Sequence, residues 1–142
     1  MVAAAGYREI EHTADWELEV WAPDLPGLLE QAARGMQHLA GLKLQDAPAR
    51  QLELQLTAAD AESLLVAFLG ELLFSMEQQL MGFCDFDLQV NPLPDHAGLE
   101  LHASLQGQPL LALDKEIKAV TYHDLAIASG PQGLQTRVVF DV

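Results

Sequence analysis

The sequence predicts an α+β fold, a two-layer sandwich in which two helices lie on one face of a mixed or antiparallel sheet of about seven strands. Three observations predict it. Most apolar residues alternate with polar ones, as in strands; two segments carry apolar residues at helical spacing; and turn residues separate these segments. Two helices can cover only one face of such a sheet, which favours two layers over a doubly wound fold.

The N-terminal segment predicts two paired strands. Residues 7–11 read as the first strand, and residues 12–15 read as the turn that follows it. Alternation then resumes, and Leu18, Val20 and Ala22 fall on one face of the second strand. These segments together are typical of a hairpin-like pair.

The first helix is predicted to follow at once. Asp24 is suited to cap it, Pro26 lies in its first turn, and Gly41 marks its end. The spacing of the apolar residues indicates an amphipathic helix, with a stripe formed by Leu28, Leu29, Ala32, Ala33, Met36 and Leu39.

A second helix is predicted after a half-buried strand over residues 52–56, and residues 57–60 resemble a capping arrangement. Gly70 in this helix should cost about 1 kcal/mol relative to alanine. The broad apolar stripe is best explained by packing onto a sheet, and it consists of Leu64, Leu65, Phe68, Leu69, Leu72, Leu73 and Met76.

The rest of the chain alternates as strands, and we expect one domain over residues 1–142. The predicted strands cover residues 83–90, 99–105, 117–127 and 134–140. The segments that separate them are rich in proline and glycine, at residues 92–94, 107–109 and 130–131.

Charge and cysteine content exclude several classes of protein. Seven Lys and Arg against 21 Asp and Glu give a formal charge of −14, which opposes tight, direct nucleic-acid binding. Cys84 is the single cysteine, so no internal disulfide and no cysteine-based zinc site is expected. With no signal-peptide pattern and no apolar run long enough to cross a bilayer, we expect a soluble cytoplasmic protein without a membrane partner.

The usual catalytic motifs are absent, and a few polar residues in apolar surroundings are the candidates for function. Asp15 lies where one strand gives way to the next, and Asp141 with the α-carboxylate of Val142 ends the chain. Such oxygen groups are ligands that hard cations prefer. The alternatives are that Asp15 braces a turn and that residues 141–142 are a frayed terminus.

His12, Lys118 and His123 are further candidates. In one continuous strand, Lys118 and His123 would lie on opposite faces, so they could form one cluster only at a bulge or a strand end. His123 could equally be a core histidine bonded to the backbone. His12 is ambiguous in the same way.

Four ordered motifs make the sequence similar to the archease family over nearly its whole length. They are Glu11-His12-Thr13-Ala14-Asp15, the helical segment from Glu62 to Leu73, the block from Glu116 to His123, and Val139-Phe140-Asp141-Val142. One departure from the family pattern is the short segment over residues 108–116, which contains no histidine.

The resemblance implies a small α/β fold and a non-catalytic protein cofactor of the RtcB-type RNA ligase, active in tRNA splicing and RNA repair. Archeases help this ligase form its guanylate intermediate and turn over repeatedly. Position within the motifs implies Asp15, Asp141 and Val142 as metal ligands, most often for calcium, with magnesium or manganese as alternatives. His12, Lys118 and His123 would then support the site or contact the partner.

Two other functions compete with this one. The first is a metal-dependent hydrolase that uses Asp15 and Asp141 with a histidine as general base, which predicts turnover without a partner. The second is a general chaperone or binding module, which predicts indifference to replacement of either aspartate.

Overall fold

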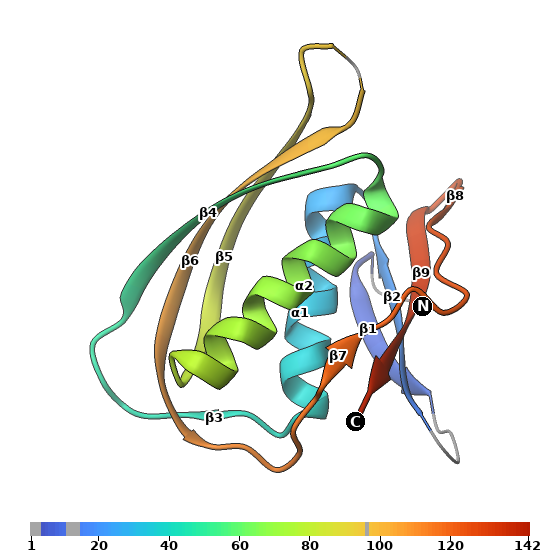
Figure 1. Cartoon of the computed structure of the whole chain (residues 1–142). Helices are drawn as coiled ribbons and strands as arrows, with labels where there is room; N and C mark the ends of the chain where they lie inside the picture. The colour runs from blue at the N-terminus through green and yellow to red at the C-terminus, as the bar shows by residue number, and fades with distance from the viewer. Residues whose placement is uncertain (1–3, 11–14, 96) are drawn as a thin grey trace.

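The computed structural model describes residues 4–10, 15–95 and 97–142, and it has two helices between two antiparallel sheets (Figure 1). Every registered strand pair in these ranges is antiparallel. The helices are α1 (Leu25–Leu39) and α2 (Ala61–Gln78). The strands are β1 (Gly6–Ile10), β2 (Trp16–Ala22), β3 (Lys43–Leu44), β4 (Arg50–Ala58), β5 (Met81–Pro92), β6 (Leu99–Ala112), β7 (Ala119–Val120), β8 (Ala128–Gly130) and β9 (Gly133–Asp141).

Both helices begin where the sequence predicts. Asp24 caps α1 by accepting a hydrogen bond from the Gly27 amide at 2.9 Å, and Asp60 caps α2 by accepting one from the Ser63 amide at 2.7 Å. Gly41, with φ of 66°, follows the end of α1. These boundaries are correct because capping depends on residues within one turn of the chain.

The α+β class is confirmed, but the strands form two sheets and not one. The first sheet has the order β1-β2-β9-β7 with β8 also paired to β9, and the second has β3-β6-β4 with β5 also paired to β6. Helix α1 contacts strands of both sheets, and α2 contacts β4, β5, β6 and β7. The two helices therefore form a middle layer. Alternation shows which face of a strand is buried and not which strand it pairs with, so the sequence missed this division.

Two predicted boundaries among the strands are wrong. Strand β6 continues to Ala112 through the predicted turn at 107–109, because Gly107 allows the backbone of Gly82 to approach closely. The predicted strand over 117–127 is interrupted: only Ala119–Val120 pairs with β9 before the chain leaves it, and pairing resumes at Ala128.

The short segment over 108–116 closes the end of α1. The amides of Asp114 and Lys115 both donate to the Ala40 carbonyl, at 2.9 and 3.0 Å. This carbonyl would otherwise be an unpaired acceptor at a helix end. In the described ranges, no helix has the length and apolar character needed to cross a membrane.

The hydrophobic core fills the space between the sheets around the helices. Phe68 of α2 and Phe140 of β9 are its largest fully buried side chains. Strand β9 thus anchors the C-terminal end of the chain in the core, next to β2 near the N-terminus.

Candidate metal-binding edge

Strands β2 and β9 bring Asp15 and Asp141 to the same edge of the first sheet. The last registered pair between these strands is Trp16 with Phe140. Asp15 precedes Trp16 and Asp141 follows Phe140, so the two aspartates flank this pair and would be opposite each other if the antiparallel register continued by one residue.

Strand alternation also puts both aspartates on the same face. Leu18 and Val138 are registered with each other and fully buried toward the helices, as is Phe140. Asp15 and Asp141 lie an odd number of residues away, so they fall on the outer face, where both are exposed. Directly opposed side chains have Cβ atoms about 4.5–5.5 Å apart, and like charges there are destabilising. A bound cation would relieve that repulsion.

The C-terminal residue lies beside this pair. The Val142 side chain packs against the hydrophobic core, and the Asp141 carbonyl accepts a hydrogen bond from the Lys118 amide at 2.8 Å. Asp141 is also registered with Ala119 of β7. The chain end is therefore integrated into the fold. We call Asp15, Asp141 and the Val142 α-carboxylate the carboxylate edge.

Oxygen donors of this kind fit calcium or magnesium, which accept about six to eight and about six oxygens respectively. Among the described residues, no three His, Cys, Asp or Glu side chains gather closely enough to hold a metal. The carboxylate edge contains two such side chains, and its third group is the chain-end carboxylate. Any ion held there would keep coordination positions for water or for a partner.

The interruption between β7 and β8 determines where His123 lies. It follows the point at which the chain leaves β9, and its side chain is 70% exposed, with Nε2 3.3 Å from Asp124 Oδ2. The core-histidine interpretation is therefore wrong. Lys118 and His123 do not lie on opposite faces of one strand, since that predicted strand is interrupted after Val120. Lys118 is exposed beside β7.

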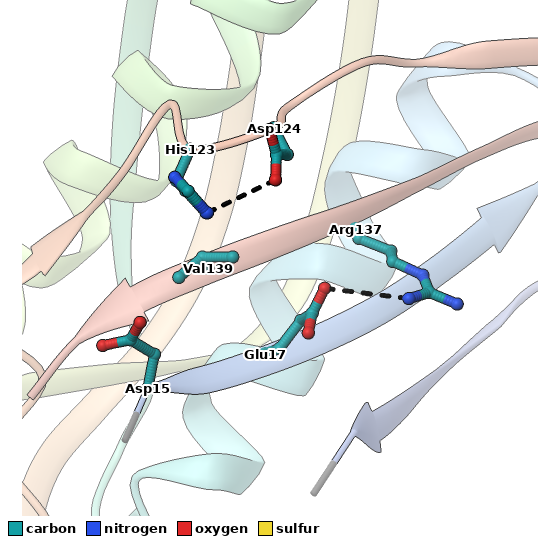
Figure 2. A pocket seen from close by; sticks show the side chains of 6 residues that line it. All are labelled: Asp15, Glu17, His123, Asp124, Arg137 and Val139. Atoms are coloured by element: carbon teal, nitrogen blue, oxygen red, sulfur yellow. Dashed lines mark ion pairs between the residues drawn. The ribbon is translucent and has the colours of Figure 1, made fainter. Parts of the chain in front are cut away.

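A cavity of about 340 Å³ lies next to the carboxylate edge on the outer face. Figure 2 shows Val139 between Asp15 and Glu17 on one side and His123 and Asp124 on the other. The residues that line this cavity are Asp15, Glu17, His123, Asp124, Arg137 and Val139. His123 is thus near Asp15 on this face, whereas His12 lies outside the described residues.

Glu17, Asp124 and Arg137 also line this cavity, and the sequence did not predict them as site residues. Glu17 is buried, and its Oε1 lies 4.0 Å from the Arg137 guanidinium. Glu17 shares a strand face with Asp15 by simple alternation, which was a usable signal. Asp124 gave no such signal, because it reaches the outer face only where the chain departs from β9.

Comparison with known proteins gives one consistent result. The model of the Archease protein family matches residues 7–142. Protein archease of Methanopyrus kandleri is 32% identical over 125 residues, which cover 85% of this chain and 88% of that protein.

Two solved structures have the same fold. The solution structure of Methanobacterium thermoautotrophicum protein 1598 aligns with a TM-score of 0.76 and 25% identity, covering 96% of this chain and 99% of the other. A Thermotoga maritima crystal structure, described as an archease and possible chaperone, aligns with a TM-score of 0.68 and 22% identity, covering 95% and 96%. Since the family model spans nearly the whole chain, this protein belongs to the archease family.

Proposed function

We propose that this protein is a non-catalytic activator of an RtcB-type RNA ligase in tRNA splicing and RNA repair. It promotes the metal-dependent guanylation of the ligase and its repeated turnover, and it acts through the carboxylate edge. The ion is calcium, with magnesium or manganese as alternatives. The observation that carries the proposal is the placement of Asp15 and Asp141 directly beyond the last registered pair of β2 and β9, Trp16 with Phe140, with both aspartates exposed.

Placing two aspartates at adjacent strand ends has an electrostatic cost. Two exposed carboxylates directly across a strand pair repel each other, and a divalent cation between them offsets the repulsion. Such an ion, when bound, supplies positive charge that stabilises the phosphate oxygens of a reacting nucleotide. Asp15, Asp141 and Val142 would bind and orient it, and the positions they leave open would face the ligase.

The charge of the whole molecule fits transient docking on a basic partner. At −14, the chain is attracted to a surface built to bind RNA, and attraction of this kind accelerates encounter more than it strengthens the complex. A fast and reversible encounter suits an activator that serves many ligase molecules. In this proposal the protein acts on the ligase in the cytoplasm.

The test is multiple-turnover ligation by the cognate ligase, with GTP and metal and with ligase well below RNA substrate. Asp15→Asn and Asp141→Asn should each lower stimulation at least about tenfold, since even outer-sphere groups at metal sites have effects of that size. Asp87→Asn is the matched control, because Asp87 is exposed on the other sheet and the charge change is the same. It should stimulate like the unaltered protein.

Other results would contradict the proposal. Equal stimulation by all four proteins would exclude the carboxylate mechanism and favour a general chaperone or binding module. Equal loss in the Asp87→Asn control would attribute the effect to overall charge. Turnover of RNA or nucleotide by this protein alone, abolished by Asp15→Asn, would favour the metal-dependent hydrolase.

A further inference from the structure

Residues 141–142 are held by β7 and by the hydrophobic core. Registered pairing with β2 stops at Phe140, and the registered partner of Asp141 is Ala119 in β7, a strand of two residues. Terminal residues ordinarily fray, and a strand this short has little stability of its own. Val120 and Val142 pack against the hydrophobic core here, and a polar interaction adds to this packing to keep β7 on β9 and Asp141 in place.

Thr121 supplies that interaction where the chain leaves β9. Its amide and its Oγ1 hydroxyl both donate to the Val139 carbonyl, at 3.0 and 2.9 Å. The same hydroxyl oxygen accepts a hydrogen bond from the His123 amide at 3.3 Å. Beyond this point residues 121–127 span the stretch that residues 136–139 cover on β9, so the chain bulges outward.

We infer that Thr121 is a positioning residue for the carboxylate edge. Its hydroxyl bonds to the Val139 carbonyl just after β7, and the Lys118 amide bonds to the Asp141 carbonyl just before β7. Together these contacts order Asp141 and Val142 before any ion binds, so binding does not have to include the entropic cost of ordering the chain end. This inference rests on the proposed metal site.

The chain offers substitutions that isolate the hydroxyl. Thr121→Val keeps the branched shape that suits a strand and removes the side-chain donor and acceptor. Thr121→Ser keeps the hydroxyl and should restore the behaviour of the unaltered protein. Thr136→Val is the matched control, because the Thr136 hydroxyl donates to the Ala126 carbonyl at 2.9 Å at the other end of the same bulge.

The first measurement is amide hydrogen exchange in the metal-free protein. In Thr121→Val, the Lys118 amide that bonds to Asp141 should exchange about fivefold faster, corresponding to the loss of one ordinary hydrogen bond. In Thr136→Val and Thr121→Ser it should exchange at the unaltered rate. An unchanged rate in Thr121→Val, or an equal increase in Thr136→Val, would overturn the inference.

The second measurement is calcium titration by calorimetry. Thr121→Val should bind calcium about fivefold more weakly, and Thr136→Val and Thr121→Ser should bind it normally. Equal affinity in all variants would overturn the inference and leave the proposed function intact. No calcium binding by the unaltered protein would contradict the proposed metal site, and the exchange rates would still decide whether Thr121 orders the chain end.

Discussion

At the scale of single residues, two helical glycines have opposite surroundings. A Cβ added at Gly70 of α2 would meet nothing within 4 Å, and the position is exposed. A Cβ added at Gly35 of α1 would lie 2.5 Å from Leu18 Cδ2 and 2.8 Å from Tyr7 Cγ. Gly35 therefore allows α1 to approach β1 and β2, whereas packing gives no reason for glycine at position 70.

The same substitution should change stability with opposite sign at these two positions. Gly70→Ala should raise the free energy of unfolding by about 1 kcal/mol, because alanine removes the backbone entropy cost of glycine in a helix. Gly35→Ala should lower it by about 1–2 kcal/mol, because overpacking outweighs that gain. Urea denaturation of both variants measures the two free energies of unfolding. A lower free energy of unfolding for Gly70→Ala would contradict the open space around Gly70.

At the scale of secondary structure elements, the start of α2 depends on the charge state of Asp60. Hydrogen bonds from Ser63, with its backbone amide the larger contributor, hold the pKa of the Asp60 carboxyl below its ordinary value of 3.8. A carboxylate at this position also interacts favourably with the helix dipole. Because the folded pKa is the lower one, this stabilisation is present above pH 3.8 and is lost as the pH falls through the folded pKa.

Replacement of this cap should therefore have a pH-dependent effect. At pH 7, Asp60→Ala should lower the melting temperature by about 3–5 °C. The difference from the unaltered protein should shrink as the pH falls from 3.8 through the lower pKa of the folded protein, where the cap carboxylate becomes protonated. Asp60→Asn keeps a capping oxygen that does not titrate, so its difference from Asp60→Ala should stay constant with pH. Thermal melts followed by circular dichroism at pH 7 and pH 3 test both statements.

At the scale of the whole molecule, one buried side chain joins the middle layer to the second sheet. Gln37 of α1 donates from Nε2 to the Phe83 carbonyl at 2.9 Å, and its Oε1 accepts from the Phe83 amide at 2.8 Å. The register between β5 and β6 shifts between Phe83 and Asp85, so this backbone lies at a bulge. The side-chain amide of Gln37 thus makes the two hydrogen bonds to the Phe83 backbone that a neighbouring strand would otherwise make.

Loss of this contact should be among the costlier single changes in the protein. Gln37→Leu leaves a buried amide and a buried carbonyl without partners and should lower the free energy of unfolding by roughly 3 kcal/mol. Gln55→Leu is the control, because Gln55 bonds to Glu100 on the exposed face of the same sheet, and it should change stability by less than about 0.5 kcal/mol. Equal effects in chemical denaturation would contradict the linking role of Gln37.

Sequence alone determined the features that depend on neighbouring residues. Helices α1 and α2 could be predicted with their caps at Asp24 and Asp60, because capping and helical periodicity operate within a few residues. The buried face of β2, formed by Leu18, Val20 and Ala22, followed from alternation, and the motifs identified the family. Asp15, Asp141 and Val142 remain a predicted ligand set, and the proposed function depends on it.

Tertiary structure alone decided which distant segments meet. Pairing of β2 with β9 puts residues 16–22 beside residues 134–140. The division of the strands into two sheets around the helices also depends on contacts between segments that are far apart in the sequence. The interruption between β7 and β8, which puts His123 and Asp124 on the outer face near Asp15, is equally invisible to alternation. Period-two patterning specifies which face a side chain occupies, whereas strand partners and bulges follow from how the whole core packs.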